Sequence, residues 1–144
     1  MSLLRTAAIA SVLLVPAAAQ AGSGQAVVPH WQSRSSDVGT KLHITNIGSV
    51  AATVTVTFYD KTNTPIGCTV TYDNFTSNNT VLGAGQTGVV QPLCGPVQWG
   101  YATISWSNGQ NSASPSLVAY GYRFYTSGTT YSEAEITVNQ GLPF

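Results

Sequence analysis

The chain has 144 residues, enough for one domain, and only 7% of them are charged, against roughly a quarter in an average globular domain. Five basic residues balance five acidic ones. No cluster of Lys or Arg is present to neutralise phosphates, which argues against nucleic-acid binding. The same lack of positive charge removes the usual electrostatic route to anionic membranes.

The first 21 residues have the features of a secretory signal peptide. Arg5 precedes an apolar run over residues 7–19, and Ala19-Gln20-Ala21 has the small-x-small pattern that signal peptidase cuts. A transmembrane helix needs about 20 apolar residues; this run is shorter, and Pro16 interrupts it. We therefore expect cleavage after residue 21, a secreted, extracellular or cell-surface location, and no membrane segment in the mature protein.

Beyond residue 21 the sequence is rich in Thr, Val, Tyr, Ser and Gly, which is typical of strands and turns. Val54, Val56 and Phe58 alternate with threonines. We expect the apolar set to face a core and the threonines to form an uncharged polar face, in water or against another subunit. In chain order, strands are expected at 26–32, 41–47, 53–60, 66–72, 80–93, 100–107, 117–127 and 130–139. Short strands separated by turns predict one antiparallel all-β sandwich.

The segment that follows the signal peptide has two possible roles. We expect residues 22–40 to form an N-terminal strand and a Ser/Gly-rich tether, and residues 41–144 to form the sandwich domain. In exported fibre subunits such a strand can leave its own domain and complete the sheet of a neighbour. The candidate donor residues are Ala26, Val27, Val28 and Trp31. Pairing within the same chain is the simpler alternative.

Two stretches, "LHITNIGSVAATVTVTFYD" and "LGAGQTGVV", resemble bacterial immunoglobulin-like modules. The cell-adhesion-related bacterial domain and fibronectin type III-like surface domains are similar. The motifs are an Asn-x-Gly turn at Asn46-Ile47-Gly48 and a Leu-x-x-Gly-x-Thr turn at Leu82, Gly85 and Thr87, within residues 42–91. The resemblance implies an immunoglobulin-like sandwich of about seven to eight strands, in a secreted or surface module that serves adhesion, spacing or assembly.

Cys68 and Cys94 are the only cysteines. An exported chain with an even number of cysteines favours a disulfide. The bond would stabilise the fold by about 3 kcal/mol through the unfolded state. A metal site or a redox pair would be the alternatives, but the CxxC spacing and nearby histidines that they require are missing.

No catalytic motif is present, so we expect no enzyme activity, no cofactor and no metal. Glu133 and Glu135 share one face of a strand at a spacing that glycosidases also use. Any Glu-x-Glu strand has this spacing, so a solvated outer face is the preferred interpretation of the pair. His30 and His43, the only histidines, are too few and too far apart in sequence for a metal site.

The aromatic residues are numerous for so small a chain. In "AYGYRFYTSGTTY", Tyr120, Tyr122 and Phe124 share one strand face, and Arg123 and Tyr125 share the other. Both faces cannot be fully buried in a two-sheet fold. The exposed one could be covered by a loop, by another subunit or by a glycan that stacks on the rings. The candidate contact residues are Trp31, Tyr120, Tyr122, Phe124, Tyr125 and Tyr131.

Together these features favour a non-enzymatic secreted structural subunit of a cell-surface or extracellular assembly, such as a fimbrial filament with strand-donation contacts. Its partner would be a second copy or another surface protein. The alternative is a secreted carbohydrate-binding or adhesion module that uses exposed Trp and Tyr side chains.

Overall fold

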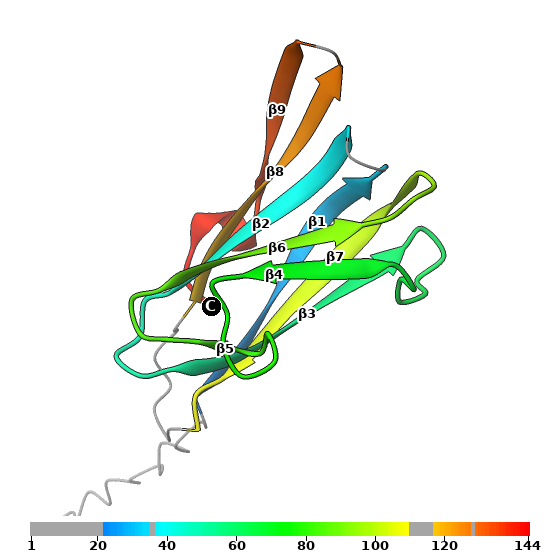
Figure 1. Cartoon of the computed structure of the whole chain (residues 1–144). Coiled ribbons are helices and arrows are strands. Elements are labelled where there is room, and N and C mark those ends of the chain that lie inside the picture. Colours follow the sequence, from blue (N-terminus) through cyan, green and yellow to red (C-terminus); the bar gives the residue numbers. More distant parts are fainter. Residues whose placement is uncertain (1–21, 35–36, 110–116, 128) are drawn as a thin grey trace, which may run out of the picture.

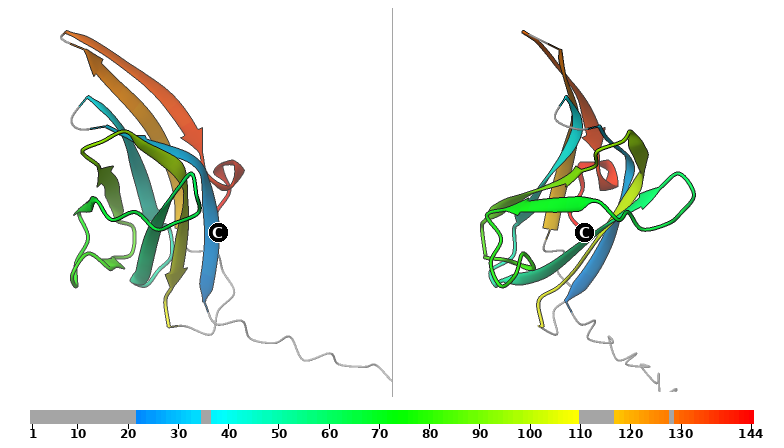
Figure 2. Two further views of the ribbon diagram at one scale, coloured as in Figure 1. Left: turned by 90° about the vertical axis from the view of Figure 1, so that its right-hand side faces the viewer. Right: turned by 45° about the vertical axis from the view of Figure 1, so that its right-hand side comes forward.

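The computed structural model describes residues 22–34, 37–109, 117–127 and 129–144, so the expected signal peptide at 1–21 lies outside the described residues. The described chain folds into two antiparallel sheets (Figures 1 and 2). Sheet A has the order β1-β7-β3-β5 and sheet B the order β4-β6-β2-β8-β9. The strands are β1 (Ser23–Ser33), β2 (Val38–Asn46), β3 (Ala52–Asp60), β4 (Thr69–Asp73), β5 (Val81–Leu82), β6 (Thr87–Leu93), β7 (Gln98–Ser107), β8 (Leu117–Ser127) and β9 (Thr130–Thr137), followed by the 3-10 turn η1 (Asn139–Gly141). The predicted all-β antiparallel sandwich is confirmed.

One expected strand is divided between the two sheets. The segment 80–93 was expected as a single kinked strand, but it forms β5 in sheet A and β6 in sheet B. The residues between them turn at Gly85, whose φ of 70° favours glycine. The described chain therefore has nine strands rather than the seven or eight expected. The strand expected at 66–72 begins only at Thr69, because Ile66 donates its backbone N–H to Phe58 in the other sheet.

Strand β1 pairs with β7 of the same chain, which is the simpler of the two alternatives; donation in trans stays a prediction. The register shifts between Val28 and Trp31, at Pro29 and His30. Val28 and Trp31 are both fully buried in the core. The N-terminal strand is thus part of the sandwich, and β2 begins at Val38, earlier than expected.

The core lies between the sheets and follows the predicted alternation. Val54, Val56 and Phe58 are buried, while Thr53 and Thr55 are exposed. Phe58 meets the edge of Trp31 with ring centroids 5.5 Å apart. Residues from both ends of the described chain, β1 and Phe144, belong to the same cluster.

The predicted disulfide between Cys68 and Cys94 is confirmed, with the two Cα atoms 5.2 Å apart. It joins the segments that precede β4 and follow β6, which are neighbours in sheet B. In the part of the chain that the structure describes, no helix is long and apolar enough to cross a membrane.

The two turn motifs of the immunoglobulin-like resemblance contact each other through Asn46. This side chain is fully buried; its amide nitrogen donates to the carbonyls of Val50 (2.8 Å) and Leu82 (3.0 Å), and its oxygen accepts from the N–H of Gly48 (2.9 Å). Its backbone carbonyl accepts from Gly85 at 2.9 Å. Asn46 therefore joins the β2–β3 turn to the β5–β6 turn.

Replacing Asn46 by alanine is expected to lower the free energy of unfolding by about 2–3 kcal/mol, because the lost bonds leave buried groups unpaired. Urea unfolding followed by circular dichroism measures this change. Thr45→Ala, which removes only the exposed hydroxyl contact with Thr87, is the matched control and should cost much less. Equal losses in the two variants would contradict this role of Asn46.

Candidate functional site

Several aromatic side chains lie together on the outer face of sheet B. In the strand register, Tyr120 lies between His43 and Thr137, Tyr122 between Lys41 and Glu135, and Phe124 between Gly39 and Glu133. Each of these three sets of paired residues forms a row that crosses β2, β8 and β9. We call this surface the aromatic face, made of Lys41, His43, Tyr120, Tyr122, Phe124, Tyr131, Glu133 and Glu135.

A histidine is the centre of the aromatic face. The ring of His43 stacks on Tyr120, with centroids 4.8 Å apart and planes 9° apart, and on Tyr122, at 5.6 Å and 27°. Tyr120 is 50% exposed, whereas Tyr122 is only partly exposed. Stacking of this kind covers one face of each tyrosine ring within the protein, so a partner meets mainly the remaining face, the ring edges and the hydroxyls.

Phe124 is covered by its own neighbours. It is buried because it lies on Gly39, where an added Cβ would come within 2.5 Å of the ring. The ammonium of Lys41 is 5.6 Å from the centroid of Phe124, within reach of a cation–π interaction. Tyr131 stacks on the same ring at 6.5 Å.

Two acidic residues line the β9 side of the aromatic face. Both Glu133 and Glu135 are exposed, and Glu133 accepts a short hydrogen bond from the hydroxyl of Tyr131. This hydrogen bond is the main reason why the pKa of Tyr131 rises to about 12. Lys41 lies on the β2 side. The aromatic face is therefore flanked by opposite charges on its two sides.

Some residues that the sequence predicted to contact a partner are not at the aromatic face or are not exposed. Trp31 was expected at the surface but lies in the core, where its indole N–H donates to the carbonyls of Tyr59 (2.8 Å) and Tyr101 (2.9 Å). Phe124 is also buried. Tyr125 is 47% exposed on the opposite face of β8, in the β8–β9 hairpin that projects beyond the other strands (Figure 1).

Sequence reasoning missed the role of His43, which it weighed only as a metal ligand. The signal was present, because Leu42 and Ile44 point inward and His43 must therefore point outward. Among the described residues, no three or more His, Cys, Asp or Glu side chains are grouped so that they could hold a metal ion.

The outer face of sheet A has a different character. Thr53, Thr55 and Thr57 of β3 lie opposite Ser107, Ser105 and Thr103 of β7, which lie opposite Ser23, Gln25 and Val27 of β1. We call these nine residues the hydroxyl face. It carries no charge at any of these positions, so its association with another surface would meet no charge repulsion.

Burial affects the titration of His43. Burial lowers the pKa of His43 below its usual 6.5, and the nearby Lys41 lowers it further. Its Nε2 atom is buried and has no hydrogen-bond partner within the described part of the chain. The fold therefore favours the neutral ring.

The thermal midpoint is expected to fall as the pH drops from about 7.5 to about 5.5. Below 6.5 the unfolded chain binds the proton that folded His43 resists, so stability is lost in that window. His43→Phe keeps a ring between the tyrosines and should weaken the dependence, with the rest due to His30, whose pKa burial also lowers. Calorimetry of both proteins checks this. An unchanged pH dependence in His43→Phe would contradict it.

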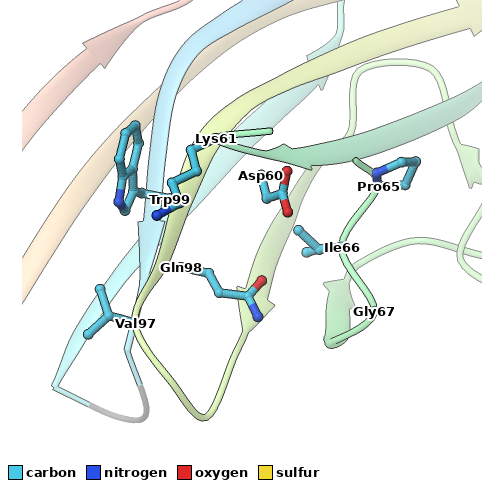
Figure 3. Close-up of a pocket in the computed structure, with 8 residues that line it drawn as sticks. All are labelled: Asp60, Lys61, Pro65, Ile66, Gly67, Val97, Gln98 and Trp99. Atoms are coloured by element: carbon cyan, nitrogen blue, oxygen red, sulfur yellow. The ribbon is translucent and has the colours of Figure 1, made fainter. Parts of the chain in front are cut away.

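A third surface surrounds Trp99 and contains two open hollows. The first measures about 280 Å³ and is lined by Asp60, Lys61, Pro65, Ile66, Gly67, Val97, Gln98 and Trp99 (Figure 3). The second measures about 320 Å³ and is lined by Pro29, His30, Asp60, Lys61, Asn63, Trp99, Gly100 and Tyr101. Three of these residues, Asp60, Lys61 and Trp99, belong to both hollows.

Comparison with known proteins supports the fold alone. No family model and no curated protein matches the chain. A solved structure described as the crystal structure of Thermotoga maritima 1070 is similar, with a TM-score of 0.52 and 16% sequence identity. The similarity covers 80% of this chain and 92% of that one.

Proposed function

We propose that this protein is a non-enzymatic, exported structural subunit that associates with a second copy through the aromatic face. The observation that carries the proposal is this ordered set of rings, of which Tyr120 and Tyr131 are about half exposed, with Lys41 on one side and Glu133 and Glu135 on the other. The signal-peptide pattern and the resemblance to immunoglobulin-like surface modules support an extracellular or cell-surface location.

The charges make the aromatic face self-complementary. In one row, Lys41, Tyr122 and Glu135 follow each other across β2, β8 and β9. If two copies meet face to face about a two-fold axis parallel to β8, β2 of one copy lies over β9 of the other. Lys41 of each copy then faces Glu135 of the second copy, and the Tyr122 side chains meet at the axis. Such an isologous contact is the commonest way to form a dimer.

The arrangement of the rings favours a protein partner over a glycan at this face. A sugar stacks on an open ring face, but His43 covers one face of Tyr120 and one face of Tyr122, and Phe124 is buried. Tyrosine edges and hydroxyls with flanking charges are typical of protein interfaces.

A filament needs a second contact, because a two-fold interface closes on itself. The hydroxyl face lies on the opposite side of the sandwich and is uncharged, so back-to-back contact there would extend dimers into an open stack. Donation of β1 to a neighbour is the alternative route, and it would have to reproduce the burial of Val28 and Trp31 in trans.

The aromatic-face contact is tested by a charge swap. Analytical ultracentrifugation of the mature protein should show concentration-dependent association, which Lys41→Glu and Glu135→Lys each weaken by about tenfold or more. Combining both substitutions should restore much of the affinity. Lys61→Glu makes the same change in net charge away from this face and serves as the control. A wild-type protein that is monomeric at all concentrations, or a double variant no better than the single ones, would overturn the proposal.

A further inference from the structure

The three tryptophans occupy different environments. Trp31 and Trp106 are buried, and their indole N–H groups donate to main-chain carbonyls, Trp106 to that of Phe144 at 2.7 Å. Trp99 is 48% exposed. Within the described residues, its N–H has no acceptor and no other aromatic ring stacks on it. A large indole left open at the surface is available to a ligand.

The backbone around Trp99 is held rigidly. Trp99 lies on β7, paired with Gln32 of β1. The next residue, Gly100, packs so closely on the main chain of β3 that an added Cβ would lie 2.0 Å from the carbonyl oxygen of Tyr59. Tyr59 and Tyr101 stack beside it at 4.8 Å. The indole is therefore carried on a fixed backbone and lines both hollows.

Polar groups surround the indole with both donors and acceptors. Asp60 Oδ1 accepts from the backbone N–H groups of Thr62 (2.8 Å) and Thr64 (3.0 Å) and from the Thr62 hydroxyl (2.7 Å). These bonds, with the Thr62 hydroxyl contributing most, lower the pKa of Asp60, so it stays ionised. Its second oxygen accepts no hydrogen bond within the described chain, and Asp60 lines both hollows.

The donors come from three side chains. The oxygen of the Asn63 amide accepts from the Tyr101 hydroxyl, which leaves the amide nitrogen to donate. Figure 3 shows Gln98 directed into the hollow between β7 and the segment 65–67, and Lys61 beside Trp99. Lys61 and Asp60 balance each other in charge.

We infer that Trp99 and its two hollows form a binding subsite for a neutral glycan. The apolar face of a pyranose ring would stack on the indole. Its hydroxyls would donate to Asp60 and accept from Lys61, Asn63 and Gln98. Because Trp99 lines both hollows, consecutive sugar units would pass from one to the other along the indole. The balanced charge selects uncharged over acidic sugars, and an open site of this depth predicts affinities in about the millimolar range.

The test is a titration of the mature protein, labelled with nitrogen-15, with cellohexaose, chitohexaose and mannohexaose, and with an oligogalacturonate as the acidic comparator. The indole N–H signal of Trp99, assigned from its loss in Trp99→Phe, should shift saturably with at least one neutral probe, while the signals of Trp31 and Trp106 stay in place. Trp99→Ala should weaken binding by tenfold or more, Asp60→Asn should weaken it by less, and Trp99→Phe should retain most of it.

Ile47→Ala, at an exposed apolar residue that lines neither hollow, is the matched control for the loss of a surface side chain. Tyr120→Ser, on the aromatic face, should bind the probe as the wild type does, which separates this site from the proposed association. The inference is overturned if no neutral probe moves the Trp99 signal, if only the acidic probe binds, or if Trp99→Ala binds with wild-type affinity. None of these results would bear on the ultracentrifugation test of association through the aromatic face.

Discussion

Replacing Trp31 by alanine is expected to lower the free energy of unfolding by about 3–5 kcal/mol, the largest effect of any single substitution discussed here. The side chain is fully buried, meets Phe58 edge to face, and donates one N–H to two carbonyls from different strands. Its loss would leave a cavity between the sheets and would also leave the two carbonyls without this hydrogen bond.

Trp31→Phe separates most of the packing contribution from the rest, because it keeps a six-membered aromatic ring and removes the pyrrole part of the indole with its N–H. We expect it to cost about 1–3 kcal/mol, the range for an unpaired buried group. Urea unfolding followed by far-ultraviolet circular dichroism suits both variants, since it does not depend on tryptophan emission. A loss of less than about 1 kcal/mol in Trp31→Ala would show that β1 is not part of the core in solution.

Removal of the disulfide is expected to cost about 3.5 kcal/mol. The bond closes a loop with a sequence separation of 26, and in the chain-entropy account this loop restricts the unfolded state. The local structure has further support, because the Ser33 hydroxyl donates to the carbonyl of Pro92 and accepts from the N–H of Cys94, each at 3.0 Å. The sandwich should therefore persist, less stable, in the double variant Cys68→Ala with Cys94→Ala.

Urea unfolding with and without a reducing agent measures this contribution. The wild type should lose stability on reduction, and the double variant should not respond. A wild-type midpoint that is unchanged by complete reduction, checked by thiol counting, would contradict the predicted stabilisation.

The alternation of side chains predicted the sandwich and most strand faces. Tyr120, Tyr122 and Phe124 share a face as expected. Strand β8 has the predicted limits, since Pro115 and Gly128, residue types that disfavour strands, stand near its two ends in the sequence. The split between β5 and β6 could not be predicted, since a glycine turn within one strand and a turn that changes sheets have the same local sequence. Only tertiary pairing distinguishes them.

The burial of individual aromatic residues depends on contacts that a single strand does not encode. Trp31 is inward because the register shift at Pro29 and His30 puts it on the same face as Val28, three positions earlier, where strict alternation would separate them. Phe124 is buried because Gly39, on the neighbouring strand, leaves room for its ring. The predicted strands gave no indication of which residues would be opposite each other.

Electron microscopy of the mature protein, both purified and sheared from its native cells, tests the central proposal most directly. We expect ordered assemblies in which neighbouring subunits meet at the aromatic face. They should be absent in Lys41→Glu and recover in the double variant that also carries Glu135→Lys. Monodisperse single particles from both sources, at concentrations where the wild type should associate, would contradict a structural role.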